Sequence, residues 1–178
     1  HNLVKQYEQL TSIPVDPDDP YYGKDPRLEA SIVVNGSDWF VTEARPDFVV
    51  AQAPGEAVDQ NALNASRTGY YLKKFLTPNL NLTQGQGAQH NWVVFRYAEI
   101  LLNYAEALNE VAGPDGTTAT GSDGTTHTFT LTPRAALQMV RDRASTDLPA
   151  VTTANKDDFR DALKHERMIE LVFEDHRY

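Results

Sequence analysis

The chain has no cysteine among its 178 residues, which excludes disulfides and metal sites built on thiolates. Basic residues are also scarce: 16 Lys and Arg stand against 25 Asp and Glu, giving a net charge of −9. Because nucleic-acid binding depends on clustered Lys and Arg, this balance argues against a nucleic-acid partner. No apolar run is long enough to cross a bilayer, and residues 1–20 lack the basic start and apolar centre of a signal peptide.

Hydrophobic residues make up 40% of the chain, enough for a core. The stretch from Val93 to Val111 contains neither Gly nor Pro and is dense in Ala, Leu and Glu. Its composition predicts a helix, which Gly113 and Pro114 should end. One apolar stripe at helical spacing comprises Val94, Ala98, Leu101, Ala105, Leu108 and Ala112, and a second comprises Ile100, Tyr104, Ala107 and Val111. A helix with two apolar faces needs neighbours on two sides.

Two further helices are predicted toward the C-terminus. Thr132 and Pro133 are typical of a helix start and predict a helix over 134–145. Asn155 is a suitable cap for a last helix that continues through residue 178. A lengthened linker at 113–131, with a small hairpin in its tail, would join the helix over 93–111 to the helix over 134–145. These two helices would then form an αα-hairpin of tetratricopeptide type.

The first half of the chain has a different character, with four prolines between residues 14 and 26. We expect a short helix over 1–10, a strand over 28–34 that ends in an Asn35-Gly36 turn, a return strand near Trp39, and another strand over 69–75. The predicted fold is therefore mainly α, with tetratricopeptide-like helical packing, a loop-rich region and a few short β-strands. Residues 1–91 would form the loop-rich part and residues 92–178 the helical part.

The last helix carries three carboxylates at i, i+4 and i+8, namely Glu166, Glu170 and Glu174, with His165 nearby. A carboxylate-bridged metal site in a helical bundle is one interpretation, but the Glu-x-x-His spacing of such sites is absent. An ion-pair network with Arg96, Arg141 or Arg167 on neighbouring helices explains the acids without a metal. No serine lies in a nucleophile motif and there is no phosphate-binding glycine loop, so the sequence predicts neither an enzyme nor a cofactor.

The remaining candidates are aromatic side chains in loops. Tyr21, Tyr22 and Trp39 lie outside the helical stripes, where rings offer flat apolar surfaces for ligands such as the face of a pyranose. Each could equally fill a hydrophobic core. We take these three as the candidate ligand-binding residues and expect Trp92, at the start of the long helix, to belong to the core.

Six segments, in the same order, resemble motifs of the SusD/RagB family. They are HNLVKQYEQ, DPRLEASIVVNGSDW, TGYYLKKFLTPN, FRYAEILLNYAEALNEV, ALQMVRDRAS and FRDALKHERMIELVFEDHRY. Family members are several times longer, beginning with a lipoprotein signal and N-terminal helical repeats, so we expect this chain to be a C-terminal portion of such a protein.

The resemblance implies a surface-exposed outer-membrane lipoprotein that binds glycans without catalysis. It would deliver oligosaccharide to a SusC-like TonB-dependent transporter, and its lipid anchor would lie outside this chain. The residues themselves leave two alternatives open: a tetratricopeptide-type interaction scaffold without sugar binding, and a helical-bundle metalloenzyme that uses Glu166, Glu170, Glu174 and His165.

Overall fold

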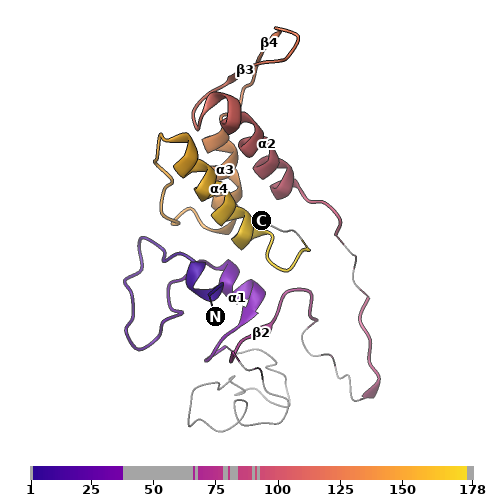
Figure 1. Ribbon diagram of the computed structural model, residues 1–178. Coiled ribbons are helices and arrows are strands. Elements are labelled where there is room, and N and C mark those ends of the chain that lie inside the picture. The colour runs from indigo at the N-terminus through magenta and orange to yellow at the C-terminus, as the bar shows by residue number, and fades with distance from the viewer. Residues whose placement is uncertain are drawn as a thin grey trace. The chain divides into compact units, whose positions relative to one another are not determined.

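The computed structural model describes residues 2–37, 66, 68–77, 80, 84–89, 91 and 93–175 (Figure 1). The chain divides into two compact units, His1–Lys5 with Pro26–Trp92 and Gln6–Asp25 with Val93–Tyr178. A short 3₁₀ helix, η1 (Val4–Gln6), lies at the first change from one unit to the other. Within the described ranges, no helix has both the length and the apolar character that crossing a membrane would require.

The unit that contains Pro26–Trp92 is built on one helical turn and one strand pair. Helix α1 (Arg27–Ser31) leads into β1 (Ile32–Val33), which pairs antiparallel with β2 (Tyr71–Leu72), with Ile32 opposite Leu72. The strand predicted over 28–34 therefore forms only at its end. Pro26 explains the difference, because a proline suits the first turn of a helix and its carbonyl accepts the amide of Ala30 at 3.2 Å.

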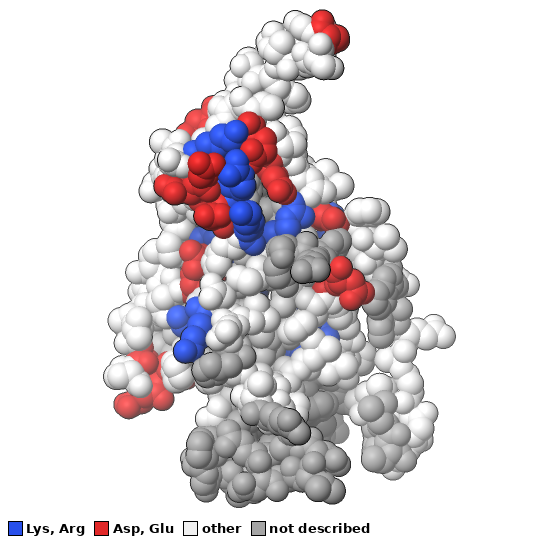
Figure 2. Space-filling model, in the orientation of Figure 1, with Lys and Arg blue, Asp and Glu red and all other residues white. Residues whose placement is uncertain are grey.

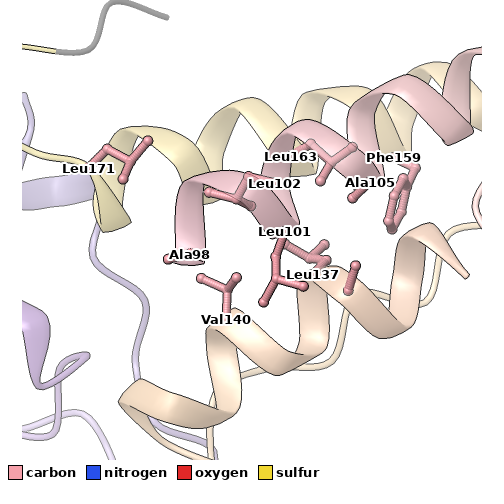
Figure 3. Close-up of a cluster of buried hydrophobic side chains, with 10 residues drawn as sticks. Ala98, Leu101, Leu102, Ala105, Leu137, Val140, Phe159, Leu163 and Leu171 are labelled. Carbon is pink, nitrogen blue, oxygen red and sulfur yellow. The ribbon is translucent and has the colours of Figure 1, made fainter. Parts of the chain in front are cut away.

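The second unit is a helical core made by α2 (Tyr97–Ala112), α3 (Pro133–Ala144) and α4 (Lys156–Glu170). Helix α2 packs against both others (Figure 1). Its predicted first stripe supplies Ala98, Leu101, Ala105 and Leu108 to the interior, and Figure 3 shows most of these beside side chains of α3 and α4. The fully enclosed members include Leu102, Leu137 and Phe159, so this cluster is the centre of the unit.

Contacts at the helix ends show that α2 runs antiparallel to both partners. The Arg134 amide at the start of α3 donates to the Pro114 carbonyl just after α2, and Lys156 at the start of α4 reaches Glu110 near the end of α2. Between α2 and α3 the chain makes a hairpin of β3 (Thr118–Thr120) and β4 (Thr126–Thr128). The expected αα-hairpin with a lengthened linker is thus confirmed.

Side-chain caps set both helix starts that the sequence predicts. The Thr132 hydroxyl accepts the Ala135 amide at 3.1 Å, and the Asn155 side chain accepts the amides of Asp157 and Asp158 at 2.8 and 3.1 Å. These contacts satisfy amides that have no partner inside a helix. Gly113, with φ of 76°, ends α2 as expected.

Two helix boundaries differ from the prediction. Helix α2 begins at Tyr97, because Arg96 has extended backbone, so Val94 is exposed and not part of the buried stripe. Helix α4 ends at Glu170, whose carbonyl accepts the Arg96 guanidinium, a cation at the favoured end of a helix. After it, Phe173 and Asp175 take positive φ angles of 62° and 60°.

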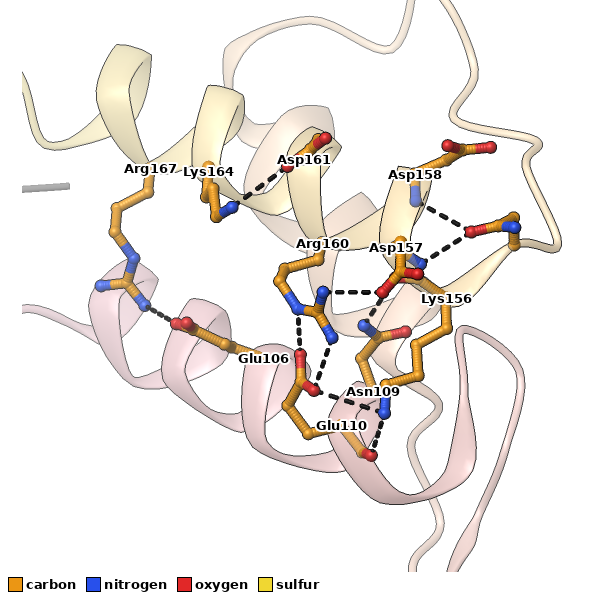
Figure 4. Close-up of polar contacts among 11 residues, drawn as sticks. Glu106, Asn109, Glu110, Lys156, Asp157, Asp158, Arg160, Asp161, Lys164 and Arg167 are labelled. Carbon is orange, nitrogen blue, oxygen red and sulfur yellow. Dashed lines mark hydrogen bonds and ion pairs between the residues drawn. The ribbon is translucent and has the colours of Figure 1, made fainter.

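A charged seam joins the outer surfaces of α2 and α4. Arg160 binds both carboxylate oxygens of Glu110, and Arg167 donates to Glu106 at 3.1 Å (Figure 4). The hydrogen bonds from Arg160 lower the pKa of Glu110 to about 2. Figure 2 shows acidic and basic side chains interspersed over this part of the surface. Exposed pairs of this kind add little stability each, but they specify how α4 lies along α2.

The fold class is confirmed: the chain is mainly helical, with two small sheets of two antiparallel strands each among the described residues. Of the helix expected over residues 1–10, only η1 forms. Residues 8–10 instead pair with residues 23–25, through the Gln9–Lys24 bridge and the Leu10 amide to the Gly23 carbonyl at 2.8 Å.

Candidate ligand-binding site

The segment Gln6–Asp25 is a closed loop that belongs to the helical unit and carries two of the candidate aromatics. Its ends meet, since the Asp25 amide donates to the Glu8 carbonyl at 2.8 Å and the Leu10 amide to Gly23. Loops whose ends are pinned on a rigid scaffold are common carriers of binding residues.

Asp147, just after α3, fixes the loop from the helical side. Its carboxylate accepts the Ser12 amide at 2.9 Å and the hydroxyls of Thr11 and Ser12, and its carbonyl accepts the Thr11 amide at 2.9 Å. Hydrogen bonds from Ser12 and Thr11 favour the ionised carboxylate and lower the pKa of Asp147.

Two further contacts tie the beginning of the loop to α3 and α4. Arg141 donates to Glu8 at 2.7 Å and to the buried Glu166 at 2.8 Å. The His165 ring nitrogen lies 2.8 Å from the Gln6 carbonyl oxygen. The loop is therefore held by both helices that pack on α2.

Tyr21 and Tyr22 come directly before residues 23–25, whose pairing with residues 8–10 closes this loop. Asp16 and Asp19 shape the backbone before them. The Asp19 carboxylate accepts the Tyr21 amide at 2.9 Å, and the Asp16 carboxylate accepts the Asp18 amide at 2.8 Å. Tyr21 is half-buried, whereas Tyr22 is 54% exposed. Trp39, the third candidate, lies outside the residues that the structure describes, as does Trp92.

Gly23 is required where the chain turns back from the two tyrosines. Its φ is +68°, and a Cβ atom there would collide with the side chains of Gln9 and Ile13. Gln9 in turn donates to the Tyr22 carbonyl at 3.2 Å. The position of Tyr22 thus depends on a glycine that the sequence alone did not single out.

Replacing Asp147 with alanine is expected to release this loop while the helices stay folded. The Ser12 amide should then lose most of its protection from hydrogen exchange, because its acceptor is gone. The Asp25 amide, which donates to a backbone carbonyl, is the internal control. In the unmodified protein, Ser12 protection should persist below pH 3.8, the ordinary pKa of an aspartate, and disappear only as pH falls through the lowered pKa of Asp147. Unchanged protection in the variant would contradict this anchoring.

The acids of the last helix are accounted for by arginines, as the ion-pair interpretation predicts. Glu166 pairs with Arg141, and Glu170 pairs with Arg96 and Arg143. Glu174 binds Arg96 at 2.7 Å. Burial opposes the charge of Arg96, but its hydrogen bonds to Glu174 and Glu170 outweigh that cost and raise the pKa of Arg96. Arg167, the third predicted partner, pairs with Glu106 on α2 instead.

His165 does not join these carboxylates, because its ring contacts the Gln6 carbonyl. Among the residues with described positions, no three side chains of the metal-binding types gather in one place. The arrangement is that of a structural network that holds α2, α3 and α4 together.

A pocket lies between the start of α2 and the end of α3 and was not anticipated from the sequence. It encloses about 360 Å³ and is lined by Arg96, Tyr97, Ala98, Leu101, Met139, Val140 and Arg143. Tyr97 belongs to neither predicted stripe, so periodicity gave no reason to select it. The one signal in the sequence was that Tyr97 is a large aromatic residue in the first turn of α2, outside both apolar stripes.

The chain thus belongs to the class of mainly helical proteins in which antiparallel helices support an anchored loop region. Comparison with known proteins identifies the family within this class. The sequence profile of the SusD family matches residues 2–178, and the chain therefore belongs to the SusD family. Among curated proteins, no sequence matches this chain.

Two solved structures from Bacteroides fragilis resemble it over 97% of its length. One, a SusD-like protein, shares 27% identity with a TM-score of 0.70. The other, described as a SusD-like carbohydrate binding protein, shares 30% identity with a TM-score of 0.63. The chain spans about a third of each, 33% and 32% of their lengths.

Proposed function

We propose that this chain is part of a non-catalytic, glycan-binding lipoprotein exposed on the surface of the outer membrane. It would deliver oligosaccharide to a SusC-like TonB-dependent transporter. The observation that carries the proposal is the family match over residues 2–178, together with a similar structure that is described as carbohydrate binding.

The anchored loop is suited to this role. Tyr22 presents an exposed ring, and exposed Asp18 and Asp19 lie beside it in the sequence. Flat aromatic rings pack against the apolar faces of sugars, and carboxylates accept hydrogen bonds from sugar hydroxyls. Because Asp147 and Arg141 hold the loop in place, little ordering cost would remain for binding.

Replacing Tyr22 with alanine in the proposed lipoprotein is expected to weaken oligosaccharide binding by about 1 kcal/mol, roughly fivefold in Kd, the size of one aromatic contact. Tyr22→Phe should retain most of the affinity, because the ring remains. Val15→Ala is the matched control: Val15 belongs to the same loop and is 72% exposed, but it has no ring. Isothermal titration with a panel of oligosaccharides measures all three.

Equal affinity for Tyr22→Ala and Val15→Ala would remove Tyr22 from the site and leave the family assignment intact. Trp39→Ala is expected to weaken binding by about the same amount as Tyr22→Ala if Trp39 stacks on the sugar. Capture of a barrel transporter by a protein that binds no member of the oligosaccharide panel would favour the interaction scaffold instead.

A further inference from the structure

The hairpin of β3 and β4 is a long insertion between two helices and adds no side chain to their core. Residues 113–132 separate α2 from α3, whereas antiparallel helices are usually joined by about two to eight residues. Figure 1 shows the hairpin extending beyond the ends of these helices. All three residues of β4 are exposed, and β3 has one partly buried residue. Long structured connections of this kind commonly carry function.

The base of the hairpin is fixed to α2 and α3. The ring of Phe129 packs edge-on against that of Tyr104 on α2, with centroids 6.0 Å apart, and the Tyr104 hydroxyl donates to the Leu131 carbonyl. Arg134, at the start of α3, binds the two carboxylate oxygens of Asp115 at 2.7 and 2.8 Å. The hairpin is therefore presented in a fixed direction, which lowers the ordering cost of binding a partner.

Two backbone hydrogen bonds establish which groups of the strands face each other. The Phe129 amide donates to the Thr117 carbonyl at 2.7 Å, and the Gly121 amide donates to the Thr125 carbonyl at 2.8 Å. In an antiparallel pair of strands, hydrogen-bonded residue pairs alternate with pairs that exchange no hydrogen bonds. Residues one position away from these four therefore direct their amides and carbonyls away from the partner strand.

On β4, the outward residues are Thr126 and Thr128, whereas His127 lies opposite Ala119 in a hydrogen-bonded pair. The hydroxyls of Thr120 and Thr126 are 3.1 Å apart, as expected of a pair without mutual backbone bonds, where side chains approach most closely. Within the described part of the chain, no hydrogen bond uses the backbone amides and carbonyls of Thr126 and Thr128. The outer side of β4 is thus an open strand edge.

This edge lacks the features that normally prevent a strand from pairing with another chain. Exposed edges usually carry Lys or Pro, or are interrupted by a bulge. Residues 116–132 contain no Lys and no Pro, and the pairing of β3 with β4 is continuous from Thr118 to Thr120. Threonine also favours the extended conformation. The edge of β4 is therefore suited to accept a further strand.

We propose that the outer edge of β4 binds an extended segment of a partner protein as a third strand. The amides and carbonyls of Thr126 and Thr128 would supply the main-chain hydrogen bonds of this strand addition. A third strand would also stabilise a ribbon that is marginal with two strands. The proposal does not depend on glycan binding.

Charge specifies the partner segment further. Asp123, exposed at the turn, is the only Asp, Glu, Lys or Arg in residues 116–132, and on the side in view the hairpin is charged only at its tip (Figure 2). Hydrogen bonds from the Thr125 amide and hydroxyl lower the pKa of Asp123, so its carboxylate is charged at neutral pH. We therefore expect a segment with a Lys or Arg at the end that lies beside Asp123.

A peptide library tests the proposal. The probes are fluorescent eight-residue peptides with blocked ends, in which threonine alternates with valine or serine and one end carries lysine. Fluorescence polarisation identifies the members that bind the proposed lipoprotein. Bound peptide should slow hydrogen exchange of the Thr126 and Thr128 amides at least about fivefold and leave the His127 amide, which already faces β3, unchanged.

Two proline variants form a matched pair. Thr126→Pro removes an outward amide of β4 and keeps the pairing with β3, because proline is tolerated at outward positions of edge strands. It should weaken peptide binding at least about tenfold, since an unmade backbone hydrogen bond is costly. Thr118→Pro makes the same change on the outer edge of β3 and should leave binding within about twofold. Protection of the Phe129 amide verifies that the hairpin is intact in both variants.

Several results would overturn the proposal. Absence of binding across the library would show that the edge accepts no strand. Equal affinities of the two proline variants would show that binding does not use the edge of β4. Slowed exchange at Thr126 and Thr128 that grows with protein concentration, without any peptide, would identify a second copy of the chain as the occupant.

Discussion

Replacing Arg141 with alanine is expected to destabilise the helical unit by about 3–5 kcal/mol, a large part of the stability of an ordinary domain. Arg141 is 1% exposed and connects three parts of the unit, donating to Glu166 of α4, Glu8 of the loop and the Pro149 carbonyl. Without it, the enclosed Glu166 carboxylate loses the guanidinium that lies 2.8 Å away. Urea unfolding followed by circular dichroism measures the loss.

Arg160→Ala is the control for this prediction. Arg160 also pairs with a glutamate of a neighbouring helix, but at the surface, where such pairs contribute less than about 1 kcal/mol. The double variant Arg141→Met with Glu166→Gln should recover part of the loss, because it removes both charges. If Arg141→Ala cost no more than Arg160→Ala, the buried network would not be what holds the loop and α4 to α3.

The second large effect is expected in the apolar core of α2. Leu102→Ala should cost about 2–5 kcal/mol, because Leu102 is enclosed between helices and its truncation leaves a cavity (Figure 3). Ile100→Ala, two residues away on the same helix but 51% exposed, should change the unfolding free energy by less than about 0.5 kcal/mol. Urea unfolding of both variants would compare the stability contributed by the buried side and by the exposed side of α2. Similar losses of unfolding free energy for Leu102→Ala and Ile100→Ala would contradict the assignment of Leu102 to the buried side of α2 and of Ile100 to its exposed side.

The helices were predictable because their signals are local. Thr132 and Asn155 cap helices through side chains within three residues, and the spacing of Leu101, Ala105 and Leu108 fixes which side of α2 is buried. An ion-pair network of the α4 glutamates with Arg96 or Arg141 was also predictable from charge, but which arginine meets which glutamate was not, and Arg167 pairs with Glu106 instead.

What escaped prediction depends on contacts between distant residues. The loop after η1 pairs with itself and with Asp147, and neither partner is visible in a local pattern. Helix α1 replaces most of an expected strand, because the alternation of Leu28, Ala30 and Ile32 is as compatible with one helical turn after Pro26 as with a strand. The pocket beside Tyr97 requires the relative position of α2 and α3.

The sequence offered loop aromatics as candidates by residue type and could not place them. In the structure Tyr22 is exposed on a loop held at both ends and Tyr21 is half-buried, and a binding role for either stays a prediction. Trp39 lies outside the described residues and stays a prediction.

The most direct test of the central proposal is an oligosaccharide-binding assay on the unmodified lipoprotein of which we propose this chain is a part, by glycan array followed by titration calorimetry. Saturable binding of at least one oligosaccharide is expected, with the sugar recovered chemically unchanged. Absence of binding across the array, or conversion of the bound sugar into a product, would contradict the assignment of a non-catalytic glycan-binding role.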